Sequence, residues 1–240
     1  MRRVVAAVAF LGALAPAVPA GAQEGVQPFL TPAPPGPPES GVSIGVSVGY
    51  SVPMGSAVGA PTGGLAATSF TDIYSGAVPL QLDLGWRFGP SLYLGAYFEY
   101  AFAFVAAAQN CNNGTTCSGG DMHFGIDFVY TFIPRAVFAP YVGFGVGYEI
   151  ATLSASNSGQ SISATYDGFE FARFIVGGDF RVGSAFRVGP FLNFSLGQFT
   201  NMSTPFNSNG ALAGTNQSVS IANKALHEWL QFGIKGTVDL

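Results

Sequence analysis

The 240-residue chain combines strong hydrophobicity with little charge: 48% of its residues are hydrophobic, 9% are charged, and the mean hydropathy is +0.37. Its formal net charge of -4 argues against nucleic acid as a partner. No stretch of roughly 18 apolar residues follows the N-terminal region, which excludes a helical membrane protein and leaves the hydrophobicity to another kind of structure.

The N-terminal region predicts export. Two arginines precede the apolar run 4–14, and the small residues 20–22 suit a cleavage site, so we expect residues 1–22 to be a signal peptide. The alternative is a short membrane anchor, but the run is shorter than the ~20 residues of a spanning helix. Six prolines in residues 23–40 favour an extended, proline-rich periplasmic linker.

Eight segments then share one pattern, with apolar side chains at even numbers and polar, glycine or charged ones at odd numbers. Successive side chains of a strand point to opposite faces, so each segment is predicted to be a strand with one apolar and one polar face. The apolar face is long, aromatic and free of charge, which indicates contact with lipid. The segments are 42–52, 78–88, 92–104, 122–132, 138–150, 172–182, 188–196 and 230–240.

The connections alternate between tight and long. Tight turns are expected at Gly89-Pro90, Pro134-Arg135 and Gly183-Ser184. The long polar stretches are 53–76, 106–120, 152–166 and 200–223. An even number of strands can close on itself and leave no backbone group unpaired in lipid. We therefore expect residues 41–240 to form an all-β domain: an eight-stranded antiparallel up-and-down transmembrane β-barrel with short periplasmic turns and four long extracellular loops.

The chain has two cysteines, Cys111 and Cys117, both in the second long polar stretch. Two cysteines this close in an exported chain are most simply a disulfide, with free thiols or a metal pair as the alternatives. We expect the bond to stiffen a surface loop.

Aromatic residues on the apolar face gather near the segment ends. Aromatic rings prefer the boundary between headgroups and hydrocarbon, so a lipid-facing girdle is expected at each end. The predicted girdle residues are Trp86, Phe88, Phe102, Phe104, Phe132, Phe138, Tyr148 and Phe180.

Charged residues within the segments fall on the polar face, which would be the barrel interior. An eight-stranded barrel is just wide enough for its side chains to fill, and buried charges must pair, so we expect a plugged interior in which Glu149 and Arg173 could meet. The inward glycines 143, 145 and 147 leave room for the alternative, a narrow path for ions or small solutes. Even-numbered charges such as Glu170 are assigned to loops or loop-proximal strand ends. The predicted interior network is Asp83, Arg87, Glu99, Asp127, Glu149, Arg173, Asp179, Arg181, Arg187 and Lys235.

Chemistry-bearing residues are few. His123 and His227 lie near loop-side strand ends, and together with Asp121 they could suggest a metal site. Their spacing matches no metal-ligand signature, so they are interpreted as polar lumen residues. No catalytic residue, metal or cofactor is predicted. Lipid A deacylases among small barrels are known for a His-x-Ser pair, whereas the triplets here are His123-Phe124-Gly125 and His227-Glu228-Trp229. A lipid-modifying enzyme is therefore a weaker hypothesis than a structural or surface-interacting protein or a narrow channel.

Signal peptide, proline-rich leader and eight alternating segments together resemble the small outer-membrane β-barrel superfamily, of the OmpA transmembrane-domain, OmpX and opacity-protein type. The chain ends in alternating Val238-Asp239-Leu240, with leucine where members typically have an aromatic residue. The resemblance implies a location in the bacterial outer membrane, contact with lipid and lipopolysaccharide, insertion by the barrel assembly machinery, and a monomer. It favours a non-enzymatic structural or surface-interaction role.

Overall fold

The computed structural model describes residues 40–60, 66–106, 111, 115–157, 160–205 and 216–240. The predicted signal peptide and nearly all of the proline-rich linker lie outside the described residues. The elements are β1 (Ser40–Val58), β2 (Thr68–Ser69), the 3-10 helix η1 (Phe70–Asp72), β3 (Tyr74–Phe88), β4 (Leu92–Val105), β5 (Thr115–Thr131), β6 (Phe138–Asn157), β7 (Gln160–Val182), β8 (Phe186–Pro205), β9 (Asn216–Ser220) and β10 (His227–Asp239). None of these described elements is a helix long and apolar enough to cross a bilayer.

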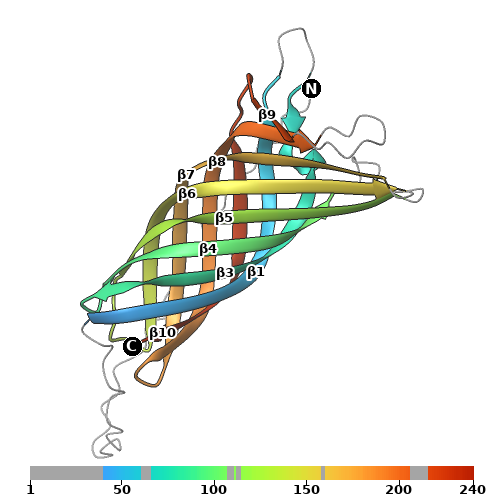
Figure 1. The fold of residues 1–240 in the computed structure, drawn as a ribbon. Coiled ribbons are helices and arrows are strands. Elements are labelled where there is room, and N and C mark those ends of the chain that lie inside the picture. The colour runs from blue at the N-terminus through green and yellow to red at the C-terminus, as the bar shows by residue number, and fades with distance from the viewer. Residues whose placement is uncertain (1–39, 61–65, 107–110, 112–114, 158–159, 206–215) are drawn as a thin grey trace, which may run out of the picture. The chain divides into compact units, whose positions relative to one another are not determined.

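Eight of the strands form a closed antiparallel ring (Figure 1). Each strand pairs with the next along the chain in the order β1, β3, β4, β5, β6, β7, β8 and β10. Closure comes from β10, which pairs with β8 on one side and with β1 on the other, where Val48 lies opposite Ile234. The predicted eight-stranded up-and-down barrel is confirmed. The short strands β2 and β9 lie outside the ring and pair with β1 and β8.

The short connections all lie at one end of the ring, here called the short-turn end; the opposite end is the loop end. They comprise residues 89–91, 132–137 and 183–185. Gly89 and Gly183 have φ angles of 61° and 80°, in the left-handed region that side chains disfavour, so glycine suits both tight turns. The three predicted tight turns are thus observed.

At the loop end, the polar stretches contain more β-structure than the sequence pattern indicates. In the stretch 152–166, β6 runs to Asn157 and β7 begins at Gln160, so most of it is a continuing hairpin and not a loop. The stretch 53–76 contains the end of β1, β2 and η1, and the stretch 200–223 contains the end of β8 and β9. Polar residues can continue a strand in water because the partner strand satisfies the backbone, so the polar composition does not mark the strand end.

Outward and inward faces follow the predicted parity in most strands. Val46, Leu82 and Ile126 are 58%, 50% and 56% exposed, while their odd-numbered neighbours face inward. The parity breaks in β7, because Gly145 of β6 pairs with Arg173 while Gly147 pairs with Glu170, which leaves one extra residue in β7. This β-bulge turns Phe171 outward and Glu170 inward, where Glu170 is 1% exposed. Glu170, which was assigned from the sequence to a loop or a loop-proximal strand end, instead lies within β7 and faces the ring interior.

Leu82→Arg tests whether the outward face contacts hydrocarbon. An arginine near the midplane of a barrel's lipid face costs about 2–4 kcal/mol, so we expect the free energy of unfolding from lipid vesicles to fall by that amount. Val219→Arg in β9 is the matched control, because Val219 is also exposed but lies outside the ring at the loop end. We expect it to change the free energy by less than about 0.5 kcal/mol. Equal effects in the two variants, measured by denaturant titration, would contradict a lipid-facing β3.

Candidate functional site: the barrel interior

The short-turn end of the interior is held by two arginines around one carboxylate. Arg87 Nε lies 3.2 Å from Asp239 Oδ1, and Arg187 donates from Nε and Nη2 to both oxygens of Asp239 at 2.9 and 3.0 Å. Arg187 Nη1 also lies 2.8 Å from Asp179 Oδ2, and the Ser43 hydroxyl donates to Asp239. These buried side chains come from β1, β3, β7, β8 and β10, so the network ties the first and last strands to the rest of the ring.

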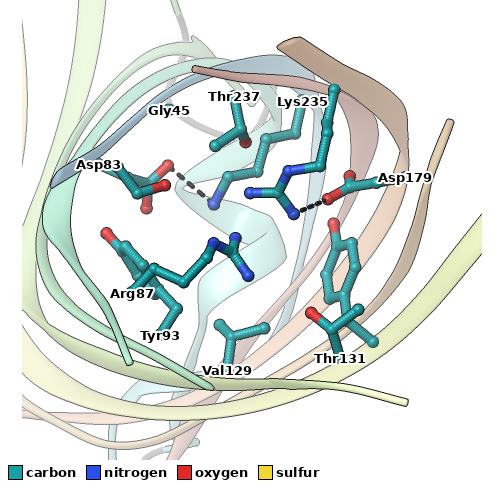
Figure 2. A pocket seen from close by; sticks show the side chains of 12 residues that line it. Gly45, Asp83, Arg87, Tyr93, Val129, Thr131, Asp179, Lys235 and Thr237 are labelled. Carbon is teal, nitrogen blue, oxygen red and sulfur yellow. Dashed lines mark hydrogen bonds and ion pairs between the residues drawn. The ribbon is translucent and has the colours of Figure 1, made fainter. Parts of the chain in front are cut away.

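A cavity lies in this half of the barrel (Figure 2). Lys235 lies beside the cavity, with its Nζ 3.0 Å from Asp83 Oδ2. Arg87 and Lys235 project toward the middle of the cavity, while Tyr93 and Thr131 line its wall. The lining thus carries charges of both signs, with three cationic groups and two carboxylates.

Arg173 occupies the centre of the interior. Its guanidinium lies 3.2 Å from Glu99 Oε2, 3.6 Å from Glu170 Oε1 and 4.0 Å from Asp127 Oδ2, and it donates to Gln81 Oε1. The guanidinium carbon also lies 4.5 Å from the centre of the Tyr97 ring. One buried cation thus links acceptors from β3, β4, β5 and its own strand, in a medium where an unpaired charge is costly.

Above Arg173, toward the loop end, lies a second group, whose contacts the sequence pattern did not predict. His123 Nε2 lies 3.1 Å from Asp121 Oδ2, and His227 Nε2 lies 2.6 Å from Glu149 Oε2. Trp229 Nε1 donates to the other oxygen of Glu149 at 3.1 Å. A Cβ on Gly197 would lie 2.7 Å from His227 Nε2, so only glycine leaves room for this pair.

Aromatic side chains cover the group at the loop end. Phe70, carried by η1, is fully buried, and its ring centre lies 4.8 Å from that of His227 and 5.0 Å from that of Trp229. Phe199 stacks on His227 at 4.1 Å and also packs against Phe70, with their ring centres 5.8 Å apart. The first long polar stretch therefore returns a helical turn into the mouth of the barrel, which its composition did not predict.

Two expectations about individual charges differ from the structure. Glu149 does not meet Arg173: Arg173 lies opposite Gly145 of β6, four residues along the strand from Glu149. The β6–β7 hairpin extends to 157 and 160, and this register separates the two side chains. Arg181 is half-buried near the short-turn end and donates to the carbonyl of Pro134. The remaining predicted network residues lie in the ring interior and are buried, with Lys235 half-buried.

The structure also places the other predicted site residues. Cys111 and Cys117 form a disulfide with a Cα–Cα distance of 5.6 Å. Tyr148 is half-buried and packs between the outward rings of Phe124 and Phe169, at 5.8 and 5.3 Å. The other girdle residues are exposed on the outer face: Trp86, Phe88, Phe102, Phe104, Phe132, Phe138 and Phe180.

The site missed by the sequence pattern consists mainly of Asp121, His123, Glu170, His227 and Trp229. Odd numbering indicated that four of them face inward. It did not show that they are neighbours, because their proximity depends on the register between strands far apart in sequence. The bulge in β7 hid Glu170 altogether.

A closed antiparallel ring with an apolar outside and a charged, hydrogen-bonded inside inverts the arrangement of a soluble protein. It is the architecture of transmembrane β-barrels of the bacterial outer membrane. The chain thus has the fold of a small outer-membrane β-barrel protein, and this class is defined here by the apolar outer face and the charged inner face of its ring.

No known family model matches the chain, and no curated protein matches it. Solved structures of similar fold include the outer membrane protein OprG from Pseudomonas aeruginosa, with 14% identity, a TM-score of 0.49, and coverage of 84% of this chain and 97% of that one. Neisserial surface protein A has 11% identity, a TM-score of 0.46, and coverage of 84% and 99%. A major outer membrane protein from Thermus thermophilus has 10% identity, a TM-score of 0.45, and coverage of 82% and 99%.

Arg173→Met tests how much the central network contributes to the free energy of unfolding. Removing the guanidinium leaves buried carboxylates of Glu99 and Glu170 without their cation, and breaking a buried pair in this way costs about 3–5 kcal/mol. Arg135→Met is the control, because Arg135 is exposed in the β5–β6 turn, and we expect a change below about 0.5 kcal/mol. Denaturant titration of both refolded variants measures the difference. A central network that stabilises nothing would show the same midpoint for Arg173→Met and Arg135→Met.

Proposed function

We propose that the protein is a non-enzymatic, integral outer-membrane protein whose interior is closed to solutes and whose loop end performs its structural or surface-interaction role. The proposal rests on the series of contacts that follow one another along the barrel interior. The Asp239 pairs, the Arg173 network and the His227–Glu149 pair lie one above another, and Phe70 covers the last of them.

Regular structure at the loop end supports a role in display. β6 and β7 continue past Glu149 and Glu170 as a hairpin, and β9 extends β8 with an additional strand. Ile162 and Val219 are exposed on these extensions, and the Cys111–Cys117 bond closes a nearby connection. A rigid surface of apolar and polar side chains above the membrane suits the binding of a partner better than the passage of solutes.

The partners follow from the same surfaces. The outward apolar belt would contact outer-membrane lipid, and lipopolysaccharide in the outer leaflet. Each described ring strand has a neighbour on both sides, so the ring itself offers no open edge to a second copy, and we propose a monomer. Insertion by the barrel assembly machinery and the absence of a nucleic-acid partner belong to this proposal.

The cavity at the short-turn end favours one second candidate, a narrow channel for small solutes or ions. Arg87, Arg187 and Lys235 line this cavity and would face a passing solute or ion. Conduction would require the contacts of Arg173 and the Phe70 cover to move aside, whereas the first proposal needs no movement.

Planar-bilayer recording of refolded protein separates these candidates. We expect the wild type to show no steady unitary conductance, because the proposal has the paired side chains and the aromatic cover of the described residues filling the lumen. Steady, reproducible single-channel steps would overturn the closed interior and favour the channel. A conducting porin recorded in the same bilayer is the control for insertion and sensitivity.

The absence of enzymatic activity has its own test. Neither histidine is followed two positions later by serine, and we expect lipid A to keep its mass after incubation with folded protein in detergent. Loss of an acyl chain, measured by mass spectrometry against a no-protein control, would replace the non-enzymatic proposal with a lipid-modifying one.

Cysteine labelling on intact cells tests the orientation. In a background with both native cysteines changed to serine, Ser218→Cys places an exposed thiol in β9 at the loop end, and Ser184→Cys places one in a short turn. We expect a membrane-impermeant maleimide to label Ser218→Cys on whole cells and Ser184→Cys only after the outer membrane is opened. The reverse pattern would show that the short turns face outward.

A further inference from the structure

We propose that Asp121, His123 and Glu149 bind one divalent transition-metal ion inside the loop end of the barrel. Asp121 and His123 lie on β5 and Glu149 on β6, where His123 and Glu149 are direct partners in the register. One ligand atom from each of the three lies within 4.8 Å of the others, and all three residues are buried. This inference is independent of whether the barrel conducts.

The donor set suits such an ion. His123 Nε2 lies 3.1 Å from Asp121 Oδ2 and 4.0 Å from Glu149 Oε1, which are separations found between ligands of a common metal. One imidazole nitrogen with two carboxylates matches the mixed nitrogen and oxygen sites of zinc and its first-row neighbours, and a purely oxygen-binding cation would not need the histidine. Zinc is therefore the probe of choice.

The surroundings orient the proposed ligands. Metal-binding histidines almost always direct the second ring nitrogen to a carboxylate or carbonyl. His123 Nδ1 lies 3.4 Å from Glu170 Oε2, and Glu170 in turn accepts a hydrogen bond from Tyr97 and pairs with Arg173. The carboxylate of Glu149 is likewise held, by Trp229 and His227. Each of these supports is buried, so the cluster is preorganised.

An unpartnered oxygen of Asp121 gives separate support for a bound cation. Oδ1 of Asp121 is buried and has no hydrogen-bond partner among the described residues, although Asp121 is only 1% exposed. A buried carboxylate oxygen without a partner is costly, and a bound cation would remove that cost.

The charge balance agrees with this interpretation. Among the described residues, eight buried carboxylates share the interior with three buried arginines and the half-buried Lys235. The carboxylates are Asp83, Glu99, Asp121, Asp127, Glu149, Glu170, Asp179 and Asp239. The loop end shares this deficit of positive charge, because histidines are the basic groups that contact Asp121 and Glu149.

Protein without a histidine tag, refolded in detergent with zinc and then separated from free metal, tests the site. Zinc must be present during refolding, because Phe70 and the ring bury the cluster in the folded protein. We expect the wild type to retain one zinc ion per chain by elemental mass spectrometry. Asp121→Asn and His123→Gln should each lower zinc affinity by more than about 10-fold.

Asp179→Asn is the matched control, since it neutralises a buried carboxylate in the network at the short-turn end. It should retain zinc as the wild type does. A heat-dependent shift on gel electrophoresis checks that each variant is folded. His227→Gln removes a support of the Glu149 carboxylate but none of the proposed ligands, so we expect weaker zinc binding in which the bound zinc keeps an imidazole ligand.

X-ray absorption at the zinc edge tests the wild type without relying on any variant. The proposal predicts nitrogen and oxygen ligands at about 2.0–2.2 Å with scattering from one imidazole. The chain has only two histidines, so an imidazole signal lost in His123→Gln assigns the ligand. A wild type that retains no zinc, bound zinc without an imidazole, or undiminished zinc in both ligand variants would overturn the proposal and leave the cluster as a network of contacts between histidines and carboxylates.

Discussion

Closure of the β-sheet is the constraint on which the rest of the structure depends. Hydrocarbon offers no hydrogen bonds, so every backbone N–H and C=O of a membrane-crossing sheet must pair within the protein. β10 meets this requirement by pairing with both β8 and β1. Once the ring is closed, side chains of alternating residues face either lipid or a narrow lumen, and the polar half of each strand has only the lumen to occupy.

The interior is organised by that confinement. Its described carboxylates outnumber its arginines, and two of the arginines each contact several of them: Arg187 contacts Asp179 and Asp239, and Arg173 contacts Glu99, Asp127 and Glu170. Aromatic residues close the loop end, where Phe70 and Phe199 enclose His227. These contacts support the proposal that the barrel is a rigid support for its loop end, and the acidic, histidine-containing group supports the proposal of a bound cation.

The sequence predicts the fold well because parity is a local property. Strand count, inward and outward faces, tight turns and the Cys111–Cys117 bond all follow from short stretches. Contacts inside the lumen depend on register and bulges, which are not local: one extra residue in β7 brought Glu170 inside, and the long β6–β7 hairpin kept Glu149 from Arg173. The entry of Phe70 into the mouth depends on a stretch whose polar composition resembles any loop.

Spin-label accessibility in liposomes tests the central claim most directly. Single nitroxides at Leu82 and Ile126, on the outward face, and at Ser218, on β9, would be introduced into a cysteine-free background. The account predicts that dissolved oxygen, which concentrates in hydrocarbon, relaxes the labels at 82 and 126 more than a water-soluble nickel reagent does, and that Ser218 shows the reverse. Greater access of nickel to positions 82 and 126 would contradict a barrel whose apolar face meets lipid.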